Sequence, residues 1–252
     1  QSFEAWREIK KGQAKEWSQE EVKLAQSLGL HLYMAVMQRR VEDTIRHQAS
    51  HDLLTGLPNR LLFCDRLSLV LANIHQRREM VAVIFLDLDG FKNINDTLGH
   101  AVGDELLQNV AKRLKKCLGE TDTVARWGGD EFTILLSSIA SAEDATNVAQ
   151  QILDEMSIPF NFAGREFYVK ASIGIAIGPY DGEDAETLLK NADAAMYRAK
   201  HQGRNNYQIY TQAIGNKAFE RLVLENNLYK ALQREEFLLH YQPQVDLNTC
   251  LL

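Results

Sequence analysis

The sequence predicts an α+β fold in which a mixed, mainly antiparallel sheet is flanked by helices and preceded by one long helix. Two observations support this. Apolar, β-branched runs are interleaved with amphipathic helical stretches along the chain. Short glycine-containing turns join some of the apolar runs as hairpins. With 252 residues, of which 45% are hydrophobic and 25% charged, the chain is long enough for one sizeable domain plus flanking pieces.

The first predicted element is a helix from about residue 18 to 50, a stretch without proline. Ser18 and Glu21 fit a capping box at its start. An apolar stripe runs along the helix, and charged residues occupy the other faces. We expect a signalling helix that pairs with its copy in a homodimer; the alternative is an amphipathic helix packed on its own domain. The stripe consists of Leu30, Met34, Met37, Val41 and Ile45.

The remaining elements are predicted in chain order from the period of the apolar residues. Helices with one buried face are expected over 61–76, 103–118, 142–156 and 185–201. Strands are expected over 81–89, 123–126, 132–136, 166–172, 173–178 and 207–210. From residue 216 a further helix and a strand-like run, 237–247, are too short to bury a core of their own, so they indicate the start of another domain.

Two acidic clusters stand at the ends of predicted strands. Asp87 and Asp89 alternate with leucines where the strand 81–89 ends, so both point to one face. The Gly128-Gly129-Asp130-Glu131 turn adds a second pair of acids, and its glycines permit a tight turn or the close approach of a ligand. If these segments are neighbours, three or four carboxylates converge, a group that favours Mg²⁺ (or Mn²⁺) and substrate phosphates. For Asp87, a solvated loop acid is the alternative.

Other polar residues have patterns with two interpretations each. Lys200 and Arg204 lie four residues apart around a predicted helix C-terminus, where Gly203 fits the C′ position. They either complement the helix dipole or bind a triphosphate. Asn95 and Asp104 carry the hydrogen-bonding groups that guanine requires, although Asp104 could equally be a helix N-cap.

Five motifs, in order, make the stretch from Asp52 to about Tyr210 resemble the GGDEF family of diguanylate cyclases. They read DLLTGLPNR, DLDGFKNINDTLGHAVGDELL, ARWGGDEF, SIGIA and ADAAMYRAKHQGRN. The resemblance implies condensation of two molecules of GTP into cyclic di-GMP with release of pyrophosphate. It also implies that each of two facing domains holds one GTP, which gives the N-terminal helix a purpose in the homodimer.

The resemblance assigns roles to individual residues. It implies metal binding by Asp87, the carbonyl of Leu88 and Asp130, and it makes Asp130 and Glu131 the catalytic pair, with Asp130 assisting deprotonation of the ribose 3′-hydroxyl. The implied substrate-binding set comprises Asn95 and Asp104 for guanine, Lys200, Arg204 and the backbone around Phe91 and Lys92 for phosphates, Gly128 and Gly129 for room, and His100.

One family motif is altered in this chain, and the flanks resemble other domains. The product-inhibition motif R-x-x-D reads Gly119-Glu120-Thr121-Asp122, so it lacks the guanidinium and anion binding there should be much weakened. The tail resembles the opening of an EAL phosphodiesterase domain, and the first residues resemble the last helix of a GAF-type sensor. The expected division is a GAF-like end (1–30), a signalling helix (31–50), a GGDEF domain (51–211), and a linker helix with a truncated EAL start (212–252).

Composition and charge exclude some functions and leave two. The net charge of −6 argues against broad nucleic-acid binding. The longest apolar run, 81–86, is far shorter than a membrane span, and the three scattered cysteines favour a reducing cytoplasm. The leading hypothesis is an active cyclase, because the metal and base carboxylates are present. The alternative is a catalytically silent GTP-binding module that regulates a following EAL domain.

Overall fold

The computed structural model describes residues 17–77, 79–162, 164–234 and 236–239, and it divides the chain into two units, Gln1–Ser50 and His51–Leu252. Among the residues described, no helix is long and apolar enough to cross a membrane. The first unit contains helix α2 (Gln19–Ser50), which continues without a break through the domain boundary expected at residue 30. Residues 1–16, the earlier part of the expected GAF-like end, lie outside the described residues.

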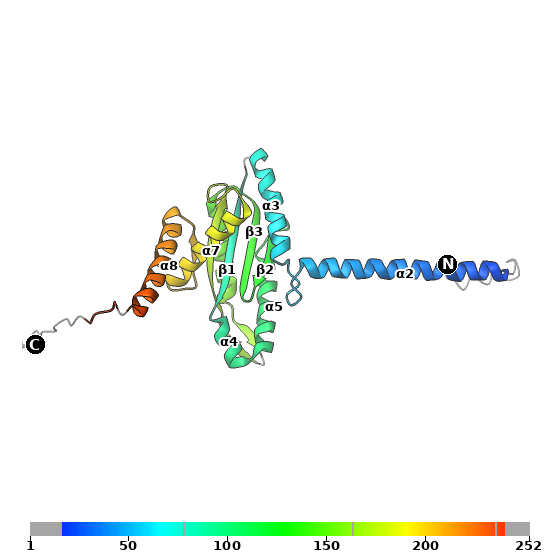
Figure 1. Cartoon of the computed structure of the whole chain (residues 1–252), viewed down its shortest axis with the longest axis horizontal. Coiled ribbons are helices and arrows are strands. Elements are labelled where there is room, and N and C mark those ends of the chain that lie inside the picture. Colours follow the sequence, from blue (N-terminus) through cyan, green and yellow to red (C-terminus); the bar gives the residue numbers. More distant parts are fainter. Residues whose placement is uncertain (1–16, 78, 163, 235, 240–252) are drawn as a thin grey trace, which may run out of the picture. The chain divides into compact units, whose positions relative to one another are not determined.

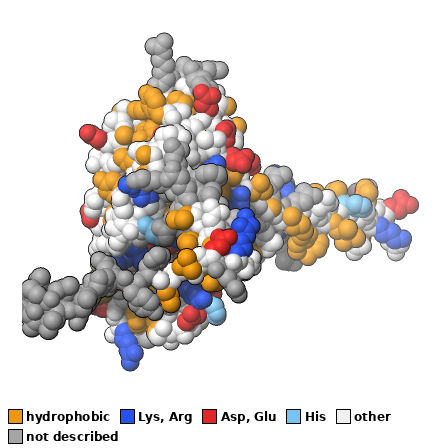
Figure 2. Space-filling model, turned by 60° about the vertical axis from the view of Figure 1, so that its left-hand side comes forward, with side chains coloured by type: hydrophobic (Ala, Val, Ile, Leu, Met, Phe, Trp, Pro, Cys, Tyr) orange, Lys and Arg blue, Asp and Glu red, His pale blue; other side chains and the backbone are white. Residues whose placement is uncertain are grey.

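Helix α2 begins as the sequence predicts. The Ser18 N–H donates to Glu21 Oε2 at 2.7 Å and the Glu21 N–H donates to Ser18 Oγ at 3.2 Å, which is the reciprocal pattern of a capping box. The residues of the predicted apolar stripe are all more than a third exposed, and Figure 2 shows apolar side chains in orange along this helix. The helix therefore presents an uncovered apolar surface.

A five-stranded sheet with the order β2-β3-β1-β6-β7 forms the centre of the second unit. Strands β1, β2, β3 and β6 pair antiparallel, and β7 pairs parallel with β6, so the predicted mixed, mainly antiparallel sheet is confirmed. The strands are β1 (Met80–Asp89), β2 (Thr123–Gly128), β3 (Glu131–Ile139), β6 (Lys170–Gly178) and β7 (Tyr207–Ile209); β4 (Phe160–Phe162) and β5 (Arg165–Phe167) form a separate hairpin.

Helices flank the sheet, and Figure 1 shows α4 and α5 at its lower end. They are α3 (Arg60–Arg77), α4 (Phe91–Leu98), α5 (His100–Lys116), α6 (Ala142–Ser157), α7 (Ala185–His201) and α8 (Gln212–Gln233). The predictions for α3, α6 and α7 are correct to within one residue at each end. Residues 236–239 form no regular element, and the rest of the strand expected over 237–247 lies outside the described residues.

Three local predictions were wrong. Helix α5 begins at His100 rather than 103, and the preceding helix α4 was not predicted. Helix α4 has eight residues, of which only Phe91 is buried, so it carries too little apolar periodicity to be recognised. Residues 166–178 form the end of the β4–β5 hairpin and then the single strand β6, rather than two successive runs. Strands β4 and β5 have three residues each, which is too few to show a period.

The two faces of β1 belong to different apolar clusters. Ile84, Leu86 and Leu88 are buried among residues of α5 and α6, whereas Val83 and Phe85 are buried among residues of α3 and α7. Because side chains alternate along a strand, the positions that continue the α3–α7 face are Asp87 and Asp89. The acids therefore stand where the core of that face ends.

Helix α7 lies unusually close to the sheet at Gly174 of β6. A Cβ atom at this position would be 2.0 Å from the Ala192 carbonyl oxygen and 2.1 Å from the Met196 amide nitrogen, both backbone atoms of α7. Only glycine permits this approach. It brings the end of α7, with Lys200, over the carboxyl end of β1.

Candidate active site

The sheet register brings the acidic turn beside the acidic end of β1. Asp87 is the cross-strand partner of Glu131, and partners in antiparallel strands point to the same face. The Leu88 N–H donates to the Asp130 carbonyl oxygen at 3.3 Å. The end of β1 and the Gly128-Gly129-Asp130-Glu131 turn are therefore neighbours in the structure, a condition that the sequence analysis had left open.

A single lysine balances part of this negative charge. Lys200 Nζ lies 2.8 Å from Asp87 Oδ2. Burial nevertheless raises the pKa of Asp87, against the effect of Lys200, and the charges of Asp130 and Asp89 raise it further. Burial likewise raises the pKa of Glu131, and the charge of Asp87 adds to the rise. The cluster is therefore short of positive charge.

The donor set fits a hard divalent cation in its chemistry. Carboxylates of Asp87 and Asp130 and the Leu88 carbonyl are oxygen ligands of the kind that Mg²⁺ prefers. Within the described ranges, however, no three His, Cys, Asp or Glu side chains are grouped so as to hold an ion. Lys200 supplies the counter-charge to Asp87 in this arrangement.

The Gly128-Gly129-Asp130-Glu131 turn is fixed by Arg126, a residue whose role the sequence analysis missed. Its Nε and Nη2 donate to the Gly129 carbonyl oxygen at 3.0 and 2.7 Å, and its Nη1 lies 3.2 Å from both carboxylate oxygens of Asp52. Burial alone would raise the pKa of Asp52, but hydrogen bonds from Thr55 and Arg126 hold it below its usual value. Arg126 thereby connects the DLLTGLPNR motif to the signature turn.

Both glycines of the turn border open space. Gly129 has a φ of 54°, in the left-handed region that favours glycine. A Cβ at Gly128 or Gly129 would meet no atom within 4 Å. The outer side of the turn can therefore accommodate a ligand.

The predicted guanine-binding residues lie on α4 and α5. The buried Oδ1 of Asn95 has no hydrogen-bond partner in the described part of the chain, and a Cβ at Gly103 would lie 1.9 Å from it. Gly103 therefore leaves the room that the Asn95 amide occupies. Asp104 is exposed in the second turn of α5, and Gly99 occupies the N-cap position, so the N-cap interpretation of Asp104 was wrong.

The predicted phosphate-binding residues lie at the start of α4 and at the end of α7, and the predicted substrate-binding residue His100 lies at the start of α5. Phe91 and Lys92 are the first two residues of α4, and His100 is the first residue of α5. At the end of α7, Gln202 is the C-cap and Gly203, with a φ of 107°, takes the predicted C′ position. Lys200 points to the acids, whereas the side chain of Arg204 is 64% exposed.

Asp89 adds its charge to the acidic cluster, as the raised pKa of Asp87 indicates, but its hydrogen-bond partners lie outside the cluster. Its Oδ1 accepts a hydrogen bond from Ser172 Oγ at 2.8 Å, and its Oδ2 accepts one from the Asn205 N–H at 3.1 Å. The convergence of carboxylates therefore involves Asp87, Asp130 and Glu131. Asp89 instead contacts the loop after α7.

A cavity of about 640 Å³ extends from Glu131 between α3 and α7. The sequence analysis did not include its lining residue Asp193, whose charge contributes to the raised pKa of Glu131. Arg60 covers another wall, with its guanidinium carbon 4.6 Å from the centroid of the Trp127 ring. These residues extend the site along the α3–α7 face.

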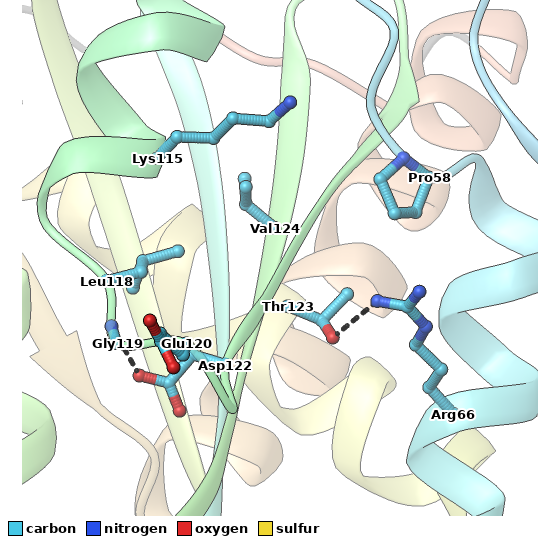
Figure 3. A pocket seen from close by; sticks show the side chains of 9 residues that line it. All are labelled: Pro58, Arg66, Lys115, Leu118, Gly119, Glu120, Asp122, Thr123 and Val124. Carbon is cyan, nitrogen blue, oxygen red and sulfur yellow. Dashed lines mark hydrogen bonds between the residues drawn. The ribbon is translucent and has the colours of Figure 1, made fainter.

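The altered product-inhibition motif lines a separate cavity of about 360 Å³ (Figure 3). There the Asp122 carboxylate accepts hydrogen bonds from the N–H groups of Gly119 and Ser137, at 3.1 and 3.3 Å. Arg66 also lines this cavity, and its Nη1 donates to Thr123 Oγ1 at 3.0 Å. Asp122 thus stabilises its own turn.

The sequence of this chain matches the model of one protein family. The model of "Diguanylate cyclase, GGDEF domain" matches residues 49–206, which is more than half of the chain. This chain belongs to the GGDEF family. The match covers strands β1, β2, β3 and β6 of the sheet, together with α3 to α7, and it ends just before β7.

Relatives of the GGDEF domain come from several bacteria. The bifunctional diguanylate cyclase/cyclic di-GMP phosphodiesterase MucR of Pseudomonas aeruginosa is 45% identical over 197 residues, which are 78% of this chain and 29% of MucR. The chain therefore spans less than a third of the length of this relative.

Two solved structures extend the comparison. The GGDEF domain of TpbB from P. aeruginosa is 43% identical with a TM-score of 0.65, covering 67% of this chain and 98% of that one. The coiled coil and GGDEF domain of DgcB from Caulobacter crescentus, in complex with c-di-GMP, is 27% identical with a TM-score of 0.67, covering 74% of this chain and 98% of that one.

Proposed function

We propose that this chain is a diguanylate cyclase that condenses two molecules of GTP into cyclic di-GMP and pyrophosphate. The observation that carries the proposal is that the β1–β3 register places Asp87 opposite Glu131 and beside the Asp130 turn, with Lys200 paired to Asp87, within a domain that belongs to the GGDEF family. In each of two steps, a ribose 3′-oxygen attacks the α-phosphorus of the other GTP and pyrophosphate leaves.

A divalent cation, Mg²⁺ or Mn²⁺, would be held by Asp87, the Leu88 carbonyl and Asp130. When bound, it would neutralise negative charge on the triphosphate. The raised pKa values of Asp87 and Glu131 support a site that requires further positive charge. Lys200, which is paired with Asp87 here, would then contact the phosphates together with Arg204.

The other proposed contacts orient the nucleotide. The first N–H groups of α4, at Phe91 and Lys92, suit phosphate oxygens. The side-chain amide of Asn95 and the carboxylate of Asp104 carry the donor and acceptor groups that suit the edge of guanine. His100, the first residue of α5, completes the proposed substrate-binding set.

The proton of the attacking 3′-hydroxyl is assigned to Asp130. A positioned carboxylate can take this proton as the oxygen attacks. Glu131 supports the geometry from the neighbouring position on β3. Gly128 and Gly129 leave room for the nucleotide, because nothing lies within 4 Å of a Cβ at either position.

A second copy of the chain completes the site. One domain holds one GTP, so two domains must face each other, and we propose that α2 brings them together as a homodimer. The exposed apolar stripe of α2 supports this pairing. The DgcB structure, which comprises a coiled coil and a GGDEF domain, offers a precedent.

We further propose the domain division that the sequence predicts: a GAF-like end (1–30), a signalling helix (31–50), a GGDEF domain (51–211) and the start of an EAL domain (212–252). The bifunctional name of MucR supports a phosphodiesterase neighbour. We place the protein in the cytoplasm, because Cys64 and Cys117 are both free thiols.

The proposal is tested by incubating the chain with GTP and Mg²⁺ and detecting cyclic di-GMP. Asp130→Ala should lower the turnover at least about 100-fold, because it removes both a cation ligand and the proton acceptor. Turnover that survives this substitution would contradict the mechanism. GTP that is bound by the unmodified chain but never converted would indicate a regulatory module instead.

We also propose that the altered R-x-x-D motif no longer binds product tightly. Gly119 supplies only a backbone N–H, and Asp122 is already used by its own turn. Calorimetric titration with cyclic di-GMP should show no submicromolar binding that depends on Asp122. Tight binding that disappears in Asp122→Ala would refute this.

A further inference from the structure

The turn after α7 has an unfavourable backbone conformation. Gly203, Arg204 and Asn205 have φ angles of 107°, 59° and 50° in succession. The left-handed region is uncommon for residues with a Cβ atom, and two such residues in a row need support from their surroundings. Since strained residues concentrate at functional sites, what holds this turn is informative.

Asp89 supplies that support from the end of β1. Its side chain is only 7% exposed, and one oxygen accepts a hydrogen bond from the Asn205 N–H at 3.1 Å. The other oxygen accepts one from Ser172 Oγ at 2.8 Å, which fixes the plane of the carboxylate. On the far side of the turn, the Asn206 amide donates to the carbonyl oxygens of Ala199 and Arg204.

The same carboxylate attracts the side chain of Arg204 but does not use the hydrogen-bond donors of its guanidinium. Arg204 Nε lies 3.7 Å from Asp89 Oδ1, which is too long for a hydrogen bond but close enough for attraction. Among the described residues, no acceptor is hydrogen-bonded to the Arg204 guanidinium, which is largely exposed. Its planar N–H groups are therefore available for phosphate oxygens.

We propose that Asp89 is a positioning residue that acts through Arg204. By holding the left-handed Gly203–Asn205 turn, it aims the Arg204 guanidinium at the phosphates of the bound nucleotide. The inference rests on the proposed function, because it needs GTP as the ligand. It separates two acids that the sequence makes equivalent: Asp87 faces the site, whereas Asp89 holds a loop that borders it.

A double-mutant cycle tests the inference. Asp89→Asn should raise the KM for GTP, and the Kd of a non-hydrolysable GTP analogue, about tenfold, while kcat changes less than about threefold. In an Arg204→Ala background the same substitution should have almost no effect on either constant, because the residue through which Asp89 acts is gone. Additive effects of the two substitutions would overturn the proposal.

A matched control separates positioning from simple stabilisation. Asp181 also accepts a backbone hydrogen bond, from the Ile177 N–H at 2.7 Å, and it lies before α7 rather than after it. Asp181→Asn should leave the KM for GTP unchanged. If both substitutions lower the melting temperature and neither changes the KM, Asp89 has only a structural role and the proposal is wrong.

Hydrogen exchange tests the turn without GTP. The Asn205 amide should exchange faster in Asp89→Ala, which removes the acceptor oxygen, than in the unmodified chain, and unchanged exchange would overturn the proposal. An unmodified chain that neither binds nor converts GTP would refute the proposed function itself. A chain that binds GTP normally but gives an additive cycle would refute only the role of Asp89.

Discussion

The two faces of β1 differ in where their apolar core ends. On the α5–α6 face, Ile84, Leu86 and Leu88 remain buried to the end of the strand. On the α3–α7 face, the apolar series ends at Phe85 and is followed by Asp87 and Asp89. The α5–α6 face therefore buries apolar side chains along its whole length, whereas the α3–α7 face has carboxylates at its last two positions.

The carboxylates at the acidic end of β1 destabilise the fold unless other groups compensate for their charge. Buried carboxylates destabilise a fold unless they are paired or hydrogen-bonded. Here Lys200 pairs with Asp87, and Ser172 and the Asn205 N–H bind Asp89. The close contact of α7 with Gly174 places the lysine where it is needed. The charge balance at the acidic end of the α3–α7 face thus depends on the position of α7. The α5–α6 face has no such requirement, because its side chains there are apolar.

The largest expected effect comes from separating α7 from the sheet. Gly174→Ala would place a methyl group about 2 Å from backbone atoms of α7, so the helix must move. We expect unfolding in denaturant to show a loss of about 3 kcal/mol in the free energy of unfolding. GTP turnover should fall as well, because Lys200 moves with α7.

Gly29→Ala is a suitable control, because a Cβ there meets nothing within 4 Å. It should not destabilise the second unit. If Gly174→Ala left both the stability and the turnover unchanged, the dependence of the acidic face on α7 would be wrong.

A smaller effect is expected from removing one acid of the cluster. Burial and the charge of Asp87 raise the pKa of Glu131, so the ionised form destabilises the folded protein. The folded state then holds its proton more strongly than the unfolded state, and stability falls as the pH rises from the ordinary glutamate value through the raised one. In buffer without metal or nucleotide, Glu131→Gln should therefore melt at a higher temperature than the unmodified chain at pH 7.

The gain in Glu131→Gln should disappear near pH 4, where the carboxyl is protonated in both states. Melting curves at the two pH values measure it. The exposed Glu120→Gln serves as the control and should change little at either pH. A variant that is less stable than the unmodified chain at pH 7 would contradict the sign of the shift.

Local patterns were enough to predict most elements of this fold. The period of apolar residues gave α3, α6 and α7 to within a residue, and Gly203 was recognised as the C′ residue from its place after Lys200. Helix α4 was missed because Phe91 is its only buried residue. The β4–β5 hairpin was missed because its strands have three residues each.

The site depends more on long-range contacts, which no local pattern contains. The convergence of Asp87 and Glu131 follows from the β1–β3 register, and the sequence could state it only as a condition. Asp87 and Asp89 have the same local pattern, yet Ser172 and Asn205, far along the chain, give Asp89 a different role. The bond from Arg126 to Asp52 spans a similar distance in sequence.

The most direct test of the account compares one substitution on each face under the same conditions. GTP turnover to cyclic di-GMP would be measured at 25 °C for Asp130→Ala and for Ile84→Val, which removes a methylene group from the α5–α6 face. We predict that Asp130→Ala loses turnover at least about 100-fold and keeps its melting temperature. We predict that Ile84→Val keeps its turnover and loses about 1 kcal/mol of stability. Equal turnover in Asp130→Ala and the unmodified chain would contradict the account.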